Sequence, residues 1–450
     1  MRFRIFVTVC TLAVACAVSD EAGAQDGEAA FQANCATCHV EADTAENLNV
    51  PSVEALRAYT SEAILNSLLN GRMRIEGTPL TEADRRAVAQ FLGGRPLRER
   101  SAGSSVVRCT TSPSFPGAGA ADGWNGWGNG IGNTRFAPNG GLSAADLPRL
   151  KLKWAFGFAD VTSARAQPAL VGDRLFVASD SGEVHALDPE TGCAYWSFLA
   201  QATVRTGLFV APYAVPDGGA GWAVFFGDLR ANAYALDATS GRSIWSRKLD
   251  EHPLAAITGT IVYHDGRVLV PVQGLNEEVQ GGRPEYECCT FRGSLSALGA
   301  GRGGQWGSAV DARQAYFGVA DFGTSAPGGM VAVDLATGER VWHRPAQELL
   351  CGTPSRACSA AQGAAVTAIP GAVLSGSLDG GLRAYAADDG ALLWQLDTNR
   401  EFTTVNGVKA NGGSMDAAGP TVAGGLLFVN SGYGGTVSRP GNVLLVFGVD

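Results

Sequence analysis

The sequence predicts a mainly β protein, in which a propeller of strands follows a small α-helical domain. Glycine supplies 60 of the 450 residues, well above the proportion in an average domain, while charged residues make up only 17%. A unit of short strands that ends in tryptophan recurs beyond residue 124. Together these features favour many short strands joined by tight turns over a bundle of helices.

The first 24 residues have the pattern of an export signal. A basic start with Arg2 and Arg4 precedes an apolar run over residues 5–18, and Ala22-Gly23-Ala24 supplies a cleavage site. We therefore expect residues 1–24 to be a signal peptide whose removal leaves no membrane-spanning segment. A lipoprotein signal that ends at Cys16 is the alternative. Either way, the mature chain is expected outside the cytoplasm, in the periplasm, where disulfides persist.

A covalent haem site is the most specific motif in the chain. Cys35-Ala36-Thr37-Cys38-His39 forms a C-x-x-C-H, in which each thiol can form a thioether with a haem vinyl group. The histidine then lies under the iron as the proximal ligand. A redox-active C-x-x-C and half of a zinc site are the alternatives. Because no second Cys or His pair with metal-ligand spacing follows nearby in the sequence, the motif predicts haem c.

Met73 is the candidate sixth ligand of the haem iron. It follows His39 by 34 residues, and a capping Thr81 then begins a predicted helix over residues 83–92. A methionine that only fills core or surface space is the alternative. A methionine loop before a C-terminal helix is typical of a small class I cytochrome c, so we predict that domain over residues 26–98 and a linker over 99–123. Ligation by methionine and histidine raises the haem potential, which suits an electron acceptor.

Residues 124–450 are predicted to form the propeller, with about six blades. In four units a turn glycine precedes a tryptophan by four residues: Gly192 and Trp196, Gly241 and Trp245, Gly338 and Trp342, and Gly390 and Trp394. Strands that recur with a period of roughly 40–50 residues are typical of propeller blades. We expect each glycine to adopt a positive φ and each tryptophan to pack between neighbouring blades.

The two ends of this region are expected to share one sheet. Residues 150–158, which include Trp154, have the pattern of a last blade strand without its partners. The chain ends on an apolar strand over residues 442–447. Pairing these two segments would close the ring and remove its open edges.

Charge and histidine content disfavour two other kinds of protein. The formal net charge of −9 argues against nucleic acid as a partner. The five histidines are scattered, and no Ser/His/Asp arrangement supports a hydrolase or a nuclease.

The order of these domains resembles the quinohaemoprotein alcohol dehydrogenases, and among them the polyvinyl-alcohol dehydrogenase (cytochrome) group. The resemblance covers nearly the whole mature chain. The segments that carry it, besides the haem motif and the Trp repeats, are Trp124-Asn125-Gly126-Trp127-Gly128, Asn133-Thr134-Arg135-Phe136, Tyr286-Glu287-Cys288-Cys289-Thr290-Phe291-Arg292-Gly293, Gln305-Trp306-Gly307-Ser308-Ala309 and Val366-Thr367-Ala368-Ile369-Pro370-Gly371.

The resemblance implies a PQQ-type β-propeller with pyrroloquinoline quinone (PQQ) and Ca²⁺ on its axis. Such enzymes oxidise an alcohol at the quinone and pass electrons singly to haem c. A downstream periplasmic acceptor, such as another cytochrome c, would then take the electrons. The Ca²⁺ would act as a Lewis acid held by oxygen ligands.

The resemblance also assigns residues to these cofactors. Arg205 matches the arginine that pairs with the PQQ carboxylates, with a blade-surface arginine as the alternative. Glu277 and Glu278 stand where the family places a calcium-binding glutamate, with a solvated loop as the alternative. Arg292 is expected to reinforce the same site.

The cysteines beyond the haem motif form a vicinal pair and four others. Cys288 and Cys289 are adjacent, and in related quinoproteins a disulfide ring of this kind packs on the cofactor face. Pairing of each with another cysteine, or a reduced pair, is the alternative. The remaining pairings open to the chain are a local loop between Cys351 and Cys358 and a bridge from Cys109 to Cys193.

The chain departs from the family after residue 298. Family members usually carry about eight blades, but here a glycine-rich stretch over residues 299–304 runs directly into Gln305-Trp306. The family has roughly two further blades at this point, including a calcium-binding G-T-G-N motif and the acidic segment that supplies the catalytic base. The sequence therefore assigns no catalytic residue. Asp321 and Asp416 are loop carboxylates that could substitute, with turn residues as the alternative.

Two functions are consistent with these motifs. The first is a periplasmic alcohol dehydrogenase, acting on polyvinyl alcohol or another secondary or primary alcohol, that depends on PQQ, Ca²⁺ and haem c. The second is a binding or assembly propeller without catalysis, joined to an electron-transfer cytochrome c domain.

Overall fold

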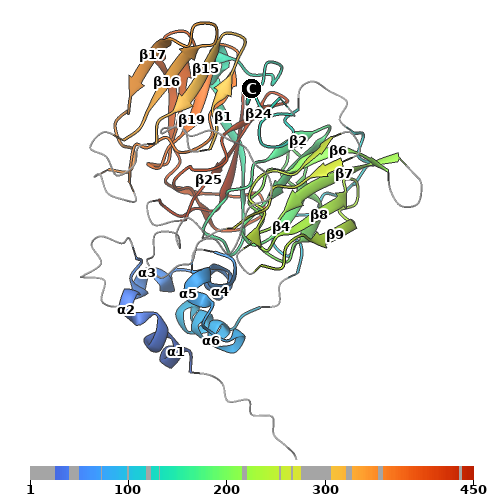
Figure 1. Ribbon diagram of the computed structural model, residues 1–450, viewed down its shortest axis with the longest axis vertical. Coiled ribbons are helices and arrows are strands. Elements are labelled where there is room, and N and C mark those ends of the chain that lie inside the picture. The colour runs from blue at the N-terminus through green and yellow to red at the C-terminus, as the bar shows by residue number, and fades with distance from the viewer. Residues whose placement is uncertain are drawn as a thin grey trace, which may run out of the picture.

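The computed structural model is shown in Figure 1. It describes residues 26–39, 50–71, 73–98, 101–117, 123–130, 132–214, 220–252, 255–264, 267–274, 306–320, 327–352, 358–434 and 438–450. Several predicted features lie outside these residues, namely the signal peptide over 1–24 and Glu277, Glu278, Cys288, Cys289, Arg292 and Asp321.

The helices of the described residues form an N-terminal domain, which lies against one face of the propeller (Figure 1). They are α1 (Gly27–Asn34), α2 (Ala36–His39), α3 (Val53–Arg57), α4 (Ser61–Leu69), α5 (Arg74–Gly77) and α6 (Glu82–Gly93). Phe31, Leu68 and Val88 are among the buried residues of their shared core. Helix α6 begins after Thr81, whose hydroxyl accepts the Asp84 N–H in a capping box, and ends at Gly94 with φ 66°. The predicted helix over 83–92 is confirmed.

Five four-stranded antiparallel sheets form the blades seen among the described residues. They consist of β2 (Ala169–Val171), β3 (Arg174–Ala178), β4 (Glu183–Leu187) and β5 (Ala194–Leu199); β6 (Phe209–Ala214), β7 (Ala220–Gly227), β8 (Asn232–Asp237) and β9 (Ser243–Lys248); β14 (Ala309–Val310), β15 (Gln314–Gly318), β16 (Gly329–Asp334) and β17 (Arg340–Pro345); β18 (Thr367–Ile369), β19 (Ala372–Gly376), β20 (Gly381–Ala386) and β21 (Leu392–Asp397); and β24 (Thr421–Ala423), β25 (Leu426–Ser431) and β26 (Val443–Gly448) with β1 (Lys151–Gly157).

Shorter elements complete the architecture. The two-stranded pairs are β10 (Ala255–Ala256) with β13 (Gln273–Gly274), β11 (Val262–His264) with β12 (Arg267–Leu269), and β22 (Glu401–Phe402) with β23 (Ala410–Asn411). A 3₁₀ helix, η2 (Ala144–Arg149), precedes β1. The predicted fold class, a mainly β propeller after a small helical domain, is confirmed, and five of its blades are complete four-stranded sheets among the residues described.

The first and last strands of the propeller share one sheet, as predicted. Strand β1 pairs antiparallel with β26, with Ala155 opposite Leu445 and Phe156 opposite Leu444. Every residue of β25 and β26 is buried, because apolar side chains of each blade pack against both neighbouring blades. This pairing of distant segments leaves neither end as an open sheet edge.

The repeated tryptophans pack between blades at three interfaces. Each donates an indole hydrogen bond to a main-chain oxygen in the turn of the following blade: Trp154 to Pro189 at 3.0 Å, Trp196 to Ala238 at 2.9 Å and Trp342 to Ala387 at 2.8 Å. The turn glycines that follow these oxygens, Gly192, Gly241 and Gly390, have φ of 72°, 70° and 74°. Both predictions for the repeat are therefore confirmed at these interfaces.

Trp245 behaves differently. Its indole N–H donates to the hydroxyl of Tyr213 in its own sheet, at 3.2 Å. Its partner therefore differs from those of the other three tryptophans, which donate to a turn of the next blade.

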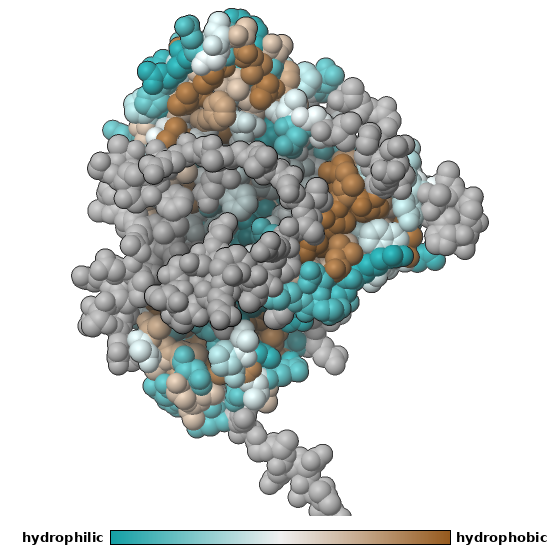
Figure 2. Space-filling model, in the orientation of Figure 1, coloured by the Kyte–Doolittle hydropathy of each residue, from teal (hydrophilic) through white to brown (hydrophobic). Residues whose placement is uncertain are grey.

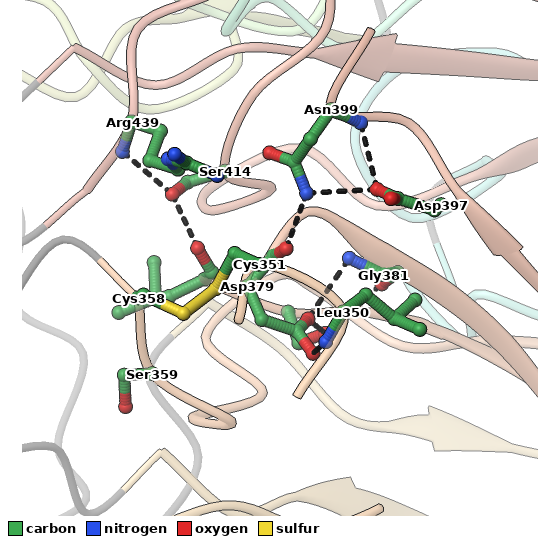
Figure 3. The surroundings of a disulfide bond; sticks show 12 residues. Leu350, Cys351, Cys358, Ser359, Asp379, Gly381, Asp397, Asn399, Ser414 and Arg439 are labelled. Atoms are coloured by element: carbon green, nitrogen blue, oxygen red, sulfur yellow. Dashed lines mark hydrogen bonds between the residues drawn. A yellow bond between two sulfur atoms is a disulfide. The ribbon is translucent and has the colours of Figure 1, made fainter. Parts of the chain in front are cut away.

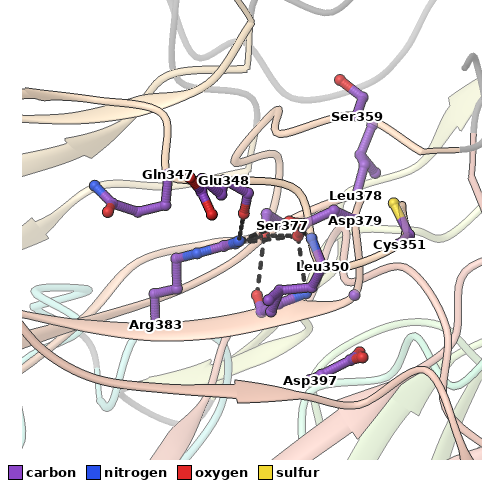
Figure 4. A network of polar contacts seen from close by, with 12 residues as sticks. Gln347, Glu348, Leu350, Cys351, Ser359, Ser377, Leu378, Asp379, Arg383 and Asp397 are labelled. Atoms are coloured by element: carbon purple, nitrogen blue, oxygen red, sulfur yellow. Dashed lines mark hydrogen bonds and ion pairs between the residues drawn. The ribbon is translucent and has the colours of Figure 1, made fainter. Parts of the chain in front are cut away.

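A buried ion pair fastens one blade to a disulfide-bonded loop. Arg383 Nη2 lies 2.6 Å from Asp379 Oδ2, and both side chains are almost completely buried. Arg383 also donates to the Glu348 carbonyl at 3.0 Å, and Asp379 accepts the Leu350 N–H at 3.2 Å (Figure 4). The adjoining disulfide joins Cys351 to Cys358 (Figure 3).

A second disulfide joins Cys109 to Cys193. It attaches the segment before the propeller to the turn after β4, where the Cys109 N–H also donates to the Ala194 carbonyl at 3.1 Å. Both predicted bridges are confirmed.

Candidate functional site

A cavity of about 360 Å³ is lined mainly by residues of the helical domain. Apolar side chains from several helices line it, including Phe31, Ile64, Leu68 and Leu92. Its size falls within the range of cofactor pockets, and its lining suits a large apolar ring system. Cys35, His39 and Met73 all border this one cavity, so the structure brings together three residues that the sequence places up to 38 positions apart.

His39 is oriented by the backbone. It is 6% exposed, and its Nδ1 lies 2.8 Å from the carbonyl oxygen of Pro51. If Nδ1–H donates to this oxygen, Nε2 is left without a proton and can bind a metal. A second hydrogen bond of this kind fixes the ring orientation of metal-ligating histidines and makes the ligand more basic.

The two cysteines of the motif are free to form thioethers. Neither Cys35 nor Cys38 belongs to a disulfide. Cys35 directly precedes the short helix α2, and Cys38 and His39 are the last two residues of that helix. Cys38 is exposed and does not line the cavity. The cavity, the two thiols and the oriented imidazole fit a covalently attached haem.

The propeller closes one side of the same cavity. Thr162, Gly434, Ser438 and Pro440 contribute to its lining. The haem cavity is therefore bounded by both domains, and Tyr433, next to Gly434 in sequence, connects it with a second group of residues.

That second group lies where four blades meet. Arg165 precedes β2 by four residues, and Arg205 precedes β6 by the same number. Trp306 and Asp416 stand shortly before β14 and β24. The Arg165 guanidinium lies 5.3 Å from the ring centre of Tyr433, and that of Arg205 lies 5.2 Å from the Trp306 ring. Blades arranged in a ring converge only near its axis, so we call Arg165, Asp180, Arg205, Trp306, Asp416 and Tyr433 the axial cluster.

Of the two arginines in the axial cluster, only Arg165 pairs with a carboxylate of the described residues. Arg165 Nε lies 3.1 Å from Asp180 Oδ1. Burial alone would lower the pKa of Arg165, but the charges and hydrogen bonds of Asp180 and Tyr433 together outweigh burial and raise it. Within the described residues, Arg205 has no carboxylate at ion-pair distance, and burial lowers its pKa. Asp416 is 9% exposed, and burial raises its pKa despite the opposing charges of Arg205 and Arg165. The cluster therefore offers a half-buried guanidinium to an anionic ligand.

Polar and aromatic atoms near this guanidinium also fit a planar anion. The buried indole Nε1 of Trp306 lies close enough to the Asp416 carboxylate to oppose the rise of its pKa, but it forms no well-aligned hydrogen bond with any described residue. The Trp127 and Trp306 rings lie 6.4 Å apart between centres. An aromatic quinone that carries carboxylates could accept from the indole, stack on a tryptophan face and pair with Arg205.

Two of the residues predicted from the sequence lie in the axial cluster, and five others are not described by the structure. Arg205 lies in the axial cluster rather than on an outer blade surface, while its role toward PQQ stays a prediction. Asp416, for which a turn was the alternative, accepts the Ala417 N–H at 2.9 Å and is buried beside the arginines. Glu277, Glu278, Cys288, Cys289 and Arg292 lie outside the described residues, so their predicted roles remain untested.

The predicted calcium ligands, Glu277 and Glu278, have no counterpart elsewhere in the described chain. No group of three or more His, Cys, Asp or Glu side chains suited to a metal ion occurs in the part of the chain that the structure describes. The assignment of Glu277 and Glu278 to calcium is untested and stays a prediction. In the same part of the chain, none of the helices has the length and apolar character needed to cross a bilayer.

Arg165, Asp180 and Tyr433 were not predicted from the sequence. The repeat in the sequence could have identified Arg165. Arg165 and Arg205 occupy the same position relative to the first strand of their blades, so an arginine assigned to the axis in one blade predicts the same in the preceding blade.

Comparison with known proteins places the chain among relatives with both domains. Polyvinylalcohol dehydrogenase from Pseudomonas sp is 30% identical over 633 aligned positions, covering 100% of this chain and 97% of the relative. The chain belongs to the polyvinylalcohol dehydrogenase family. The enzyme of the same name from Sphingopyxis sp. (strain 113P3) is 29% identical over 617 positions, covering 94% of this chain and 93% of the relative. The predicted family is therefore confirmed.

Two family models match different domains of the chain. A family model described as "Outer membrane protein assembly factor BamB" matches residues 138–276 and 326–439. One described as "Cytochrome C oxidase, cbb3-type, subunit III" matches residues 22–92. The quinohemoprotein alcohol dehydrogenase of Comamonas testosteroni is 27% identical over 161 positions, which cover 35% of this chain and 23% of that protein.

The chain is a shortened member of the polyvinylalcohol dehydrogenase family. The Pseudomonas alignment has 633 positions and this chain has 450 residues, so at least 183 positions are occupied only by the relative. This shortfall exceeds two of the roughly 40–50-residue repeats of the propeller. The shortfall is larger than the roughly two blades that the sequence is predicted to lack after residue 298, and the location of the missing blades stays a prediction.

Proposed function

We propose that this chain is an exported quinohaemoprotein that oxidises an alcohol at PQQ and passes the electrons to covalently bound haem c. The observation that carries the proposal is the adjacency of its two candidate sites. Tyr433 contacts Arg165 in the axial cluster, and the next residue, Gly434, lines the haem cavity. A redox group on the axis would therefore lie close to the haem.

The residues of the axial cluster would bind and orient the cofactor. PQQ, when bound, supplies a two-electron acceptor for the alcohol. Arg205 would pair with its carboxylates, and the Trp306 indole N–H would donate to one of its oxygens. Asp180 holds Arg165 in place beside Tyr433. Ca²⁺ is proposed as the Lewis acid of the site, with Glu277 and Glu278 as its candidate ligands.

The helical domain would hold the electron acceptor. Cys35 and Cys38 would attach the haem, and His39 would bind its iron through Nε2. Met73, which borders the cavity, would be the sixth ligand and keep the haem potential high. We place the mature protein in the periplasm, after removal of residues 1–24, with another cytochrome c as the downstream acceptor.

The substrate is proposed to be polyvinyl alcohol or another secondary or primary alcohol. The names of the two relatives that align along the whole chain support the polymer. The cofactor and substrate can be tested together with the haem-loaded protein. After addition of PQQ and Ca²⁺, an alcohol should reduce the haem, as seen by its absorption spectrum. An unchanged haem spectrum would contradict the proposal.

Arg205 provides a specific variant for this experiment. Arg205→Ala should weaken PQQ binding, because the substitution removes the guanidinium that would pair with the PQQ carboxylates. Binding is measured by quenching of tryptophan fluorescence. Arg400→Ala is the matched control, since Arg400 also stacks on an aromatic ring, that of Phe402 at 4.9 Å, but lies exposed and away from the axial cluster. Equal PQQ affinity of both variants would show that Arg205 does not bind the cofactor.

A non-catalytic propeller joined to an electron-transfer cytochrome c domain is the second candidate. The shortfall of at least 183 aligned positions against the 633-position alignment favours it, because lost blades alter the axial pocket. Under this alternative the purified protein keeps its haem spectrum but does not bind PQQ at any Ca²⁺ concentration.

A further inference from the structure

A pocket of about 280 Å³ lies where the helical domain meets the blade formed by β6–β9. Four of its described lining residues are cationic, namely Arg74, Arg85, Arg230 and Lys248, and the others are uncharged. We call it the basic pocket. The haem site and the axial cluster use none of these four residues, so the concentration of positive charge has no part in the function proposed above.

Both domains supply cations to the basic pocket. Arg74 belongs to α5 and Arg85 to α6. Arg230 lies in the turn between β7 and β8, and Lys248 ends β9. Arg74 Nη1 also donates across the domain boundary to the Leu229 main-chain oxygen, at 3.1 Å. Figure 2 shows a hydrophilic band over the part of the propeller where β9 lies in Figure 1, above the helical domain. A ligand of this pocket would therefore contact both domains.

Most of these cations are not neutralised by acidic side chains. Among the described residues, no carboxylate lies at ion-pair distance from Arg85, Arg230 or Lys248. Arg85 Nη1 donates instead to the main-chain oxygens of Gly77 at 2.9 Å and Leu80 at 2.7 Å, and Lys248 donates to that of Arg230. Main-chain oxygens satisfy N–H groups but carry no full negative charge, so these three positive charges stay uncompensated.

The cationic groups lie close enough to affect one another. Burial lowers the pKa of Arg74, and the charge of Arg230 lowers it further, against the opposing effect of Asp228. Asp228 does not line the pocket. Its carboxylate already accepts hydrogen bonds from the Asn232 amide and the Tyr234 hydroxyl, both at 2.8 Å. Holding like charges together costs free energy, and a bound anion would offset that cost.

The guanidinium of Arg85 has donor capacity left for a ligand. Its Nε is buried and forms no hydrogen bond with any described residue. A buried N–H without an acceptor is destabilising, which makes binding of an acceptor more favourable. A concave site lined by charges of one sign also concentrates the electric field and attracts ions of the opposite sign. The basic pocket therefore has the properties of an anion site.

The number of donors favours an oxyanion with several acceptor oxygens. One guanidinium can satisfy both oxygens of a single carboxylate, whereas phosphate and sulfate present oxygens in several directions to donors from different segments. The volume of about 280 Å³ lies just below the range of pockets for drug-sized molecules, which favours a small ion. Two charges on the ligand would also balance more of the surrounding positive charge than one.

We propose that the basic pocket binds a free divalent oxyanion, of the class of inorganic phosphate and sulfate, and that this anion bridges the helical domain and the propeller. The inference goes beyond the proposed function and requires neither PQQ nor an alcohol. The bound ion would hold α5 and α6 against the turn between β7 and β8 and the end of β9.

The test is calorimetric titration of the full-length, haem-loaded protein with inorganic phosphate and, separately, with sulfate. Sodium chloride keeps the ionic strength constant, so that general screening of charges does not change during the titration. Both ions should bind saturably, and acetate should bind much more weakly. Arg230→Ala and Arg85→Gln should each weaken binding by about tenfold, because each removes a charge-assisted hydrogen bond.

Each of these variants has a matched control. Arg242 is an exposed arginine in another turn of the same blade, and Arg86 is the exposed neighbour of Arg85 in α6; neither lines the pocket. Arg242→Ala and Arg86→Gln should leave the affinity for phosphate nearly unchanged. Arg230→Lys keeps a positive charge and should retain more affinity than Arg230→Ala. Lys248→Ala repeats the test on the propeller side if Arg230→Ala does not fold.

Several results would overturn the inference. Absence of saturable binding at constant ionic strength, or equal losses in the pocket variants and their controls, would show that the pocket is not an anion site. Acetate that binds as tightly as phosphate would contradict a divalent ligand. If substitutions in only one domain weaken binding, the anion lies on that domain alone and does not bridge the two.

Discussion

Asn66 of helix α4 donates a hydrogen bond from Nδ2 to the main-chain oxygen of Asp180, at 2.9 Å. The same oxygen accepts the Thr203 hydroxyl at 2.7 Å, while the Asp180 carboxylate pairs with Arg165. Helix α4 in turn lines the haem cavity through Ala63, Ile64 and neighbouring residues. One residue of the propeller therefore fixes both an axial arginine and a helix of the haem domain, which sets the separation between the two proposed redox groups.

Removing this link should slow electron transfer without altering the haem. In Asn66→Ala the contact between α4 and the propeller loosens, and electron transfer is sensitive to the distance between the redox groups. We expect the rate of haem reduction, followed by stopped-flow absorption after mixing with alcohol, to fall at least several-fold. The haem spectrum and potential should stay unchanged.

Asn34→Ala is the control for this prediction. Asn34 also donates from Nδ2 to a main-chain oxygen, that of Ala30 at 2.9 Å, but the bond lies within exposed helix α1. If Asn34→Ala slows haem reduction as much as Asn66→Ala does, the interdomain hydrogen bond has no specific role.

Features whose determining contacts are local or repeated could be predicted from the sequence. The haem motif places Cys35, Cys38 and His39 within five residues, the Thr81 cap acts within one helical turn, and the blade unit recurs with its glycine and tryptophan. The axial cluster as a group could not be predicted in this way, although two of its members, Arg205 and Asp416, were candidates from the sequence. Its members come from four blades and are joined by contacts across up to 268 positions, as between Arg165 and Tyr433, and no short motif encodes such a pairing.

Replacement of Met73 should lower the haem potential. A thioether ligand stabilises ferrous haem, and loss of this ligand leaves the iron with a weaker or more oxygen-like partner. In Met73→Leu we therefore expect a lower midpoint potential by redox titration and a changed ferric absorption spectrum. Met415→Leu is the matched control, since Met415 is a methionine of the propeller core with 3% exposure. An unaltered spectrum in Met73→Leu would identify another residue as the sixth ligand.

Loss of the Asp379 carboxylate should destabilise the propeller by about 3–5 kcal/mol, because Arg383 would remain as a buried unpaired charge. The measurement is denaturant-induced unfolding of Asp379→Ala, with Asp388→Ala as the exposed control that should leave stability nearly unchanged. A stability loss no larger than that of the control would mean that the ion pair contributes little.

The contribution of Asp379 should also depend on pH. Burial alone would raise its pKa, but the hydrogen bonds and charge of Arg383, with Ser377 and Gly381, outweigh burial and hold the pKa below its ordinary value. The folded pKa is thus lower than the unfolded one, which is about 4. The stabilisation is therefore complete above that value and is lost as pH falls through the folded pKa. The difference between the wild type and Asp379→Ala should shrink in that acidic range and stay constant near neutral pH.

The close approach of turn glycines to tryptophans predicts a difference between two alanine substitutions. A Cβ at Gly390, where φ is 74°, would lie 2.7 Å from the Trp342 ring of the preceding blade. A Cβ at Gly407, where φ is 69°, would meet no atom within 4 Å. Both substitutions place alanine in the left-handed region at a cost of about 1 kcal/mol, but only Gly390→Ala also forces a tryptophan out of its place between blades, which adds about 1–3 kcal/mol. Denaturant-induced unfolding should therefore show a clearly larger loss for Gly390→Ala. Equal losses would show that the conformation of the turn, and not the packing of Trp342 against it, is what requires glycine in the repeat.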